Sequence, residues 1–119
     1  MSDDQIVTEM YKRYVTEAGF THPSSPTELT AIIVASGIDV EIRDDSPTKF
    51  VGMQIGNTIF INGRMIVSKI MRALAHEWYH AIRWTQTEMP NPVAFYASGD
   101  PSNNSHEERR ARLFEQLFG

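Results

Sequence analysis

The sequence contains no cysteine. This absence excludes a disulfide scaffold, a zinc ribbon with cysteine ligands, an iron–sulfur cluster and thiol catalysis. It also fits a protein of a reducing compartment. Chemistry in this chain must therefore be sought among its other side chains, which include four histidines.

A long apolar run and an excess of basic residues are also missing. No run approaches the roughly 18 apolar residues that span a bilayer. The formal net charge of −4 disfavours a broad basic surface for nucleic acid. The chain begins with acidic and polar residues, whereas a secretory signal begins basic and continues apolar. We expect a cytoplasmic protein with no membrane or nucleic-acid partner.

The composition is that of an ordinary folded domain, with 119 residues of which 41% are hydrophobic and 22% are charged. A chain of this length buries one modest core, so we expect a single domain over residues 1–119. Four segments have the apolar spacing of amphipathic helices: residues 3–18, 26–36, 65–84 and 105–118. Three short segments have the alternation of strands: residues 38–42, 50–55 and 58–61.

The turn residues support these boundaries. Ser25, Pro26 and Glu28 have the order of a capping box at a helix start. Gly56-Asn57 is a two-residue turn of the hairpin type. Residues 85–103 are rich in proline and asparagine and predict a long loop. Two helices, a small antiparallel sheet and two further helices predict an α+β fold.

The chemistry is carried by an HExxH motif in the helix predicted over residues 65–84, His76-Glu77-Trp78-Tyr79-His80. Residues four apart on a helix differ by about 40° around its axis, so both imidazoles leave one face and can share a tetrahedral zinc ion. Zinc lowers the pKa of a bound water towards about 7. Glu77 can take the proton of that water and pass it to a leaving amine.

The histidine face of this helix is opposite to its apolar stripe. The stripe consists of Val67, Ile70, Met71, Leu74, Trp78, Ala81 and Ile82. We therefore expect the histidines outside the core, where either two solvated side chains or a metal cleft would lie. We favour the metal site, because the pair comes with the glutamate that the chemistry needs.

A zinc hydrolase needs a third protein ligand and an open fourth position. Glu107 lies four, seven and eleven residues before three members of the last helix's apolar stripe, Ala111, Phe114 and Phe118. Glu108 has the spacing of a capping-box partner for Ser105. We expect Glu107 to be the ligand, with Glu108 as the alternative and His106 as a third candidate. The competing interpretation is that both glutamates only favour the helix dipole.

Three segments resemble the ImmA/IrrE group of gluzincin metallopeptidases: FIN at residues 60–62, RALAHEWYHA at 72–81 and Glu107-Glu108 at the start of an apolar helix. These are small bacterial and phage-associated proteins. The resemblance implies a zincin-like minimal metalloprotease domain. It also implies zinc ligands at His76, His80 and one of the two glutamates, with Glu77 as the catalytic base.

The chain departs from that family at Trp78 and Tyr79, where aliphatic and small residues are usual. Bulk at Tyr79 would narrow the cleft or bring a hydroxyl near it. A similar resemblance to SprT-like proteases would use His106 as the third ligand, and we do not favour it. Tyr96, in the predicted loop, either anchors that loop or donates to the oxyanion, and we favour the anchor.

Two functions follow. The first is a zinc-dependent peptidase that acts on a protein substrate, such as a transcriptional repressor, as the resemblance implies. The second is a non-catalytic zinc-binding or protein-binding regulatory module on the same fold. The intact motif of His76, Glu77 and His80 favours the enzyme, because a site without catalysis has no chemical need for the base.

Overall fold

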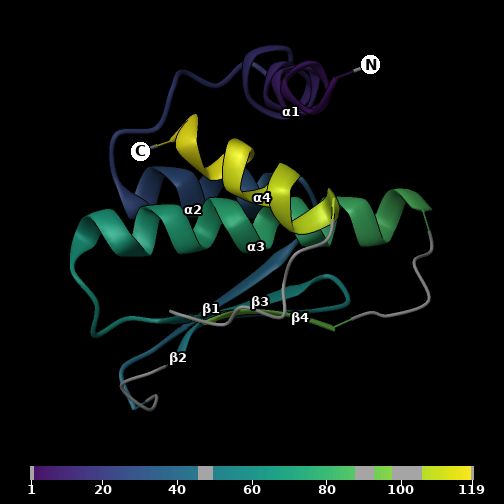
Figure 1. Cartoon of the computed structure of the whole chain (residues 1–119). Helices are drawn as coiled ribbons and strands as arrows, with labels where there is room; N and C mark the ends of the chain where they lie inside the picture. Colours follow the sequence, from purple (N-terminus) through teal and green to yellow (C-terminus); the bar gives the residue numbers. More distant parts are fainter. Residues whose placement is uncertain (1, 46–49, 88–92, 98–105, 119) are drawn as a thin grey trace.

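The computed structural model describes residues 2–45, 50–87, 93–97 and 106–118. It has a mixed α+β architecture built in layers (Figure 1). A sheet forms one side, and helix α3 (Val67–Thr87) lies across it. Helices α2 (Pro26–Ala35) and α4 (His106–Gln116) cover the other side of α3, and α1 (Asp3–Tyr11) packs on α4. The expected α+β class is confirmed.

The two N-terminal helices begin at side-chain caps. Ser2 and Gln5 form a reciprocal capping box at the start of α1. A π-helical turn, η1 (Lys12–Thr16), continues α1, and Gly19 follows with a φ of 89°. This confirms a helical segment that begins at residue 3 and ends before Gly19.

Ser25 caps α2 as expected, because its hydroxyl accepts a hydrogen bond of 3.2 Å from the backbone N–H of Glu28. The second expected contact of the capping box, between the Glu28 side chain and the backbone N–H of Ser25, is replaced by another. The Glu28 carboxylate accepts from the backbone N–H and the hydroxyl of Ser24, at 2.6 and 2.9 Å. One residue earlier in the chain therefore takes the role that the spacing gave to Ser25.

The sheet contains β1 (Asp39–Arg43), β2 (Phe50–Ile55), β3 (Thr58–Asn62) and β4 (Val93–Ala97), in the order β1-β3-β2-β4. Strands β2 and β3 form the expected hairpin, with Gly56 at a φ of 59°. The expectation of a purely antiparallel sheet is wrong, because β1 runs parallel to β3. Alternating apolar residues mark a strand but do not specify the direction of its partner.

The fourth strand corrects the loop that was expected over residues 85–103. Helix α3 extends to Thr87, and β4 pairs antiparallel with β2 along Phe50–Ile55. The prolines and asparagines around β4 obscure this short strand in the sequence. The other residues of the expected loop, 88–92 and 98–103, lie outside the described part of the chain.

The main core lies where α3 meets the sheet and the other helices. Its largest fully buried side chains include Trp78, Tyr79, Phe114, Leu29 and Ile33.

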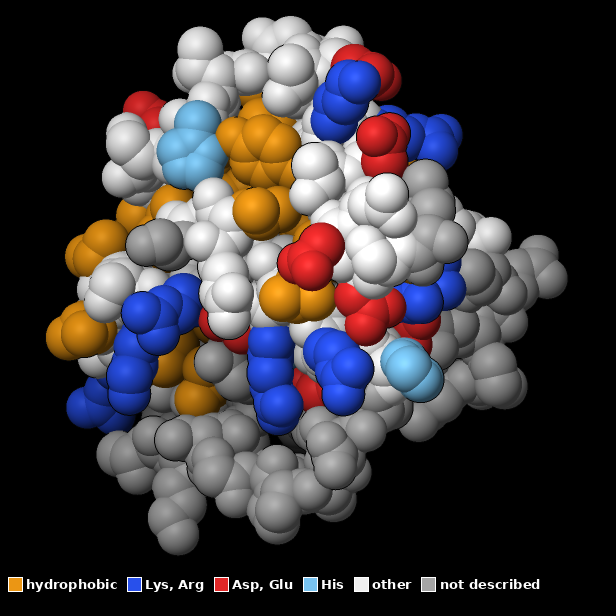
Figure 2. All heavy atoms as spheres, turned by 45° about the horizontal axis from the view of Figure 1, so that its top comes forward, with side chains coloured by type: hydrophobic (Ala, Val, Ile, Leu, Met, Phe, Trp, Pro, Cys, Tyr) orange, Lys and Arg blue, Asp and Glu red, His pale blue; other side chains and the backbone are white. Residues whose placement is uncertain are grey.

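The face that carries α1 and α4 bears basic and acidic side chains intermingled around an apolar patch (Figure 2). Among the described residues, no helix combines the length and apolar composition needed to cross a membrane.

Candidate metal centre

Helix α3 is buried on both sides at its HExxH motif. His76 and Glu77 are 0% exposed and His80 is 8% exposed. The expectation that the histidines lie outside the core is therefore wrong. The apolar stripe of α3 accounts for one buried side, but α4 packs on α3 and covers the histidines as well. A helix with neighbours on two sides has no free face for its polar residues.

Both histidines direct Nε2 at one carboxylate on α4. His76 Nε2 lies 2.6 Å from Glu108 Oε1, and His80 Nε2 lies 3.0 Å from Glu108 Oε2. The nearest potential ligand atoms of these three residues all lie within 4.8 Å of one another. The motif spacing brings the two imidazole nitrogens together, as predicted, and the packing of α4 on α3 adds the carboxylate of Glu108.

The structure places Glu108, and not Glu107, beside the histidines. Glu108 is buried in the stripe that continues through Ala111, Phe114 and Glu115. Glu107 points to α3 at another place, where it accepts hydrogen bonds from Tyr79 and Arg83. The expected inward position of Glu107 is therefore wrong, and the alternative, Glu108, occupies it. The spacing to the apolar stripe favoured Glu107, but contacts between α4 and α3 decide which glutamate meets the histidines.

Glu115 is a buried carboxylate that the sequence reasoning missed. Its Oε1 lies 2.9 Å from His76 Nδ1, so the two nitrogens of one imidazole each face a carboxylate of α4. Glu108 and Glu115 are seven residues apart, which places them on the same face of the helix, two turns apart. The signal in the sequence was this spacing of two glutamates along an otherwise apolar stripe.

Hydrogen bonds determine the direction in which the pKa values of His76 and Glu108 are shifted. Burial alone would lower the pKa of His76, but the hydrogen bonds with Glu108 and Glu115 outweigh it and raise the pKa to about 9. Burial likewise would raise the pKa of Glu108, but the hydrogen bonds from His76 and His80 lower it to about 2. In the absence of metal, the raised pKa of His76 favours an imidazolium whose two N–H groups face the carboxylates of Glu108 and Glu115.

Glu77 is buried beside this cluster without a hydrogen bond. Among the described residues, none donates to either of its carboxylate oxygens. Burial raises the pKa of Glu77 to about 8, against the opposing effect of His76. Gly52 of β2 lies close to it, because a Cβ added there would be 3.2 Å from Glu77 Cγ. The absence of a side chain at Gly52 thus leaves room for the Glu77 side chain.

The remaining candidates lie apart from the cluster. His106 is exposed at the start of α4 and is not among the three clustered residues. The hydroxyl of Tyr79 donates to Glu107 rather than into the site. The backbone of Tyr96 is in β4, opposite Gly52, but its side chain lies outside the described part of the structure. Ser105, the expected capping partner of Glu108, also lies outside it.

The donor set fits a divalent metal ion that accepts nitrogen and oxygen ligands. Two neutral imidazoles and one carboxylate form a three-ligand set of the kind that zinc hydrolases use, with a fourth position left for water or substrate. The unpartnered carboxylate of Glu77 adjoins that set. A metal ion would replace the proton on Nε2 of His76. Its positive charge would also reduce the electrostatic repulsion among the carboxylates around this histidine.

No protein-family model matches the chain, and no curated protein or solved structure matches it.

Proposed function

We propose that the chain is a zinc-dependent peptidase that hydrolyses peptide bonds of a protein substrate. The observation that carries the proposal is a buried, unpartnered Glu77 next to His76, His80 and Glu108. Burying a carboxylate without a partner costs free energy. A role as general base explains why a glutamate occupies this place and an apolar residue does not.

The proposed zinc ligands are Nε2 of His76, Nε2 of His80 and the carboxylate of Glu108. Glu115 would hold the proton of His76 on Nδ1, so that the lone pair on Nε2 is directed to the metal. When bound, zinc would polarise a substrate carbonyl and lower the pKa of a water molecule towards about 7. Hydrolysis would thus have both its electrophile and its nucleophile in one place.

Glu77 would take a proton from the attacking water and pass it to the leaving amine. Its pKa of about 8 belongs to the protein without metal. A dication held by His76, His80 and Glu108 would lower the pKa of Glu77, because an adjacent positive charge favours the ionised carboxylate. Metal binding would therefore also convert Glu77 into the form that accepts a proton.

The resemblance of residues 72–81 and Glu107-Glu108 to the ImmA/IrrE-type gluzincins supports the same activity on a zincin-like fold. It also suggests a regulatory protein, such as a repressor, as the substrate. Glu108 would then correspond to the glutamate ligand of that family. The α+β layout, with the motif helix lying across a small sheet, is compatible with this proposal.

A second candidate is a non-catalytic module that binds zinc for stability or for a protein partner. The burial of the site favours it, since His76, Glu77, His80 and Glu108 are at most 8% exposed. Structural zinc sites are closed, whereas catalytic sites keep one position open to substrate. The two candidates make different predictions for Glu77, which only the enzyme needs.

The experiment compares the wild-type protein with Glu77→Gln, each loaded with one equivalent of zinc. A mixture of unstructured peptides serves as substrate, and mass spectrometry identifies the cleavage products. We expect cleavage by the wild type only, with the same zinc content in both proteins. Equal cleavage by both would show that Glu77 is not the base. Stoichiometric zinc with no cleavage by either would favour the binding module.

A further inference from the structure

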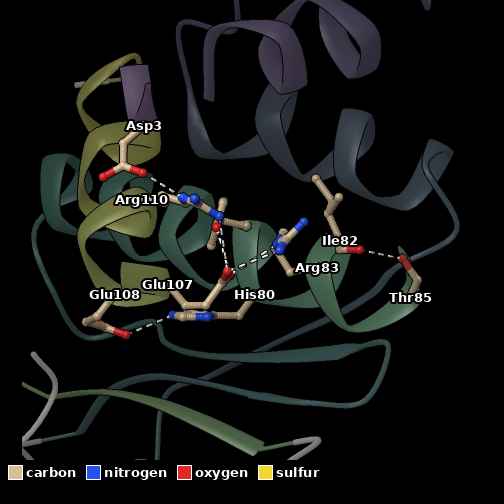
Figure 3. A network of polar contacts seen from close by, with 9 residues as sticks. Asp3, His80, Ile82, Arg83, Thr85, Glu107, Glu108 and Arg110 are labelled. Carbon is tan, nitrogen blue, oxygen red and sulfur yellow. Dashed lines mark hydrogen bonds and ion pairs between the residues drawn. The ribbon is translucent and has the colours of Figure 1, made fainter. Parts of the chain in front are cut away.

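Glu107 lies at the centre of a polar cluster that joins three helices (Figure 3). We call this cluster the Glu107 clasp; its members are Asp3 of α1, Tyr79 and Arg83 of α3, and Glu107 and Arg110 of α4. Arg83 donates two hydrogen bonds to the Glu107 carboxylate, from Nε to Oε2 at 3.1 Å and from Nη2 to Oε1 at 3.2 Å. The buried Tyr79 donates its hydroxyl to Oε2 at 2.7 Å.

The clasp continues to the N-terminal helix. Arg110 contacts Glu107 Oε1 with Nη1 at 3.4 Å and Asp3 Oδ1 with Nε at 2.8 Å. Asp3 is the first residue of α1, which the capping box of Ser2 and Gln5 fixes. The first turn of α4 is thus tied on one side to α3 and on the other to α1.

The first turn of α4 offers two adjacent glutamates, and only one can face the histidines. Neighbours on a helix diverge by about 100°, so a rotation of this size would exchange Glu107 and Glu108. The histidines would accept either carboxylate. The planar guanidinium of Arg83 binds a carboxylate in a fixed bidentate geometry, so it holds Glu107 in one orientation. Holding Glu107 in that orientation leaves Glu108 directed at His76 and His80.

We propose that Glu107 is a positioning residue, and that the Glu107 clasp selects Glu108 as the metal ligand. This inference rests on the proposed role of Glu108 as a zinc ligand. It assigns functions to Tyr79, Arg83 and Arg110 that require no contact with metal or substrate. It also makes the N-terminal helix, through Asp3, a support of the metal centre.

The test measures zinc affinity by competition with a chromophoric chelator, in four chains: wild type, Arg83→Met, Glu108→Ala and the double variant. We expect Arg83→Met to weaken zinc binding about tenfold, the scale of outer partners of metal ligands. In the Glu108→Ala background we expect Arg83→Met to strengthen zinc binding, because it releases Glu107, which can then turn to the histidines. A merely structural role of Arg83 would weaken both chains equally, and that result would overturn the proposal.

Matched variants keep the test informative. Arg112→Met alters an exposed arginine of the same helix and should leave zinc affinity unchanged in both backgrounds. Tyr79→Phe removes one hydrogen bond of the clasp without a charge and should reproduce the signs of Arg83→Met, should the latter fold poorly. The cobalt(II) absorption spectrum should change in Arg83→Met and remain unchanged in Arg112→Met. Absence of zinc binding by the wild type would refute the zinc site itself, whereas unchanged affinity in Arg83→Met would refute only the clasp.

Discussion

The imidazole of His76 lies between Glu108 and Glu115, with Nε2 2.6 Å from one carboxylate and Nδ1 2.9 Å from the other. Both carboxylates belong to α4, so one helix fixes the position and the ring orientation of a histidine on another. A carboxylate that accepts from the far nitrogen of a metal-binding histidine selects its tautomer and increases its basicity. The structure thus contains the contact that the proposed metal site would need at His76 Nδ1.

Replacement of Glu115 should weaken metal binding without removing a ligand. We expect Glu115→Ala to reduce zinc affinity by about 10- to 100-fold. Glu115→Gln keeps an oxygen acceptor for His76 Nδ1 and should lose less zinc affinity than Glu115→Ala. Chelator competition measures both, with the exposed Gln116→Ala as the matched control. Equal affinity in wild type and Glu115→Ala would show that the contact does not serve the metal.

The two adjacent glutamates should respond differently to alanine. Glu108→Ala, like His76→Ala or His80→Ala, removes a proposed ligand and should abolish tight zinc binding. It should also remove the thermal stabilisation that zinc provides, because binding energy is folding energy. Glu107→Ala should weaken binding much less. Calorimetry with and without zinc checks this order, and a larger loss for Glu107→Ala would reverse the assignment.

The metal-free protein should be most stable in mildly acidic solution. His76 has a raised pKa, from 6.5 to about 9, so its stabilising effect is complete below pH 6.5 and is lost as the pH rises towards 9. Glu108 has a lowered pKa, from 4.5 to about 2, so its effect is present above pH 4.5 and is lost as the pH falls towards 2. Thermal unfolding with chelator should therefore show a falling Tm from about pH 6.5 to 9. A Tm that rises over this interval would contradict these charge states.

Glu77 should add to the loss at high pH. Its pKa is raised from 4.5 to about 8, so the folded state binds the proton more tightly and stability falls as the pH rises through this range. Glu77→Gln removes this ionisation. In the metal-free state, the stability of Glu77→Gln relative to wild type should therefore increase from pH 5 to pH 8. Denaturant unfolding at several pH values measures it, and a difference independent of pH would show that Glu77 does not titrate there.

Local spacing predicted the parts of the molecule that depend on neighbours in the chain. The N-terminal helix, the β2–β3 hairpin and the HExxH pair of His76 and His80 are set by residues within a few positions of one another. The parallel pairing of β1 with β3 was not predictable in this way. It joins segments on either side of β2, and alternation in a single strand carries no information about direction.

The order of preference between Glu107 and Glu108 as the residue beside the histidines was wrong for a related reason. The spacing of Glu107 to Ala111, Phe114 and Phe118 favoured it as the inward residue, but its partner in the structure is Arg83, which lies 24 residues earlier on α3. The burial of His76 likewise depends on α4, whose Glu115 is 39 residues away. Helical periodicity describes one helix at a time. The inward position of Glu108 and the burial of His76 both depend on contacts between two helices, α3 and α4.

The most direct measurement is the zinc content of the protein after purification without chelator, combined with the zinc X-ray absorption spectrum. The proposed site predicts one zinc per chain, with two nitrogen ligands at about 2.0–2.1 Å and oxygen ligands for the remainder. It also predicts that zinc is lost in His76→Ala and in Glu108→Ala. A wild-type protein without zinc, or one that keeps a full equivalent in both variants, would contradict the assignment.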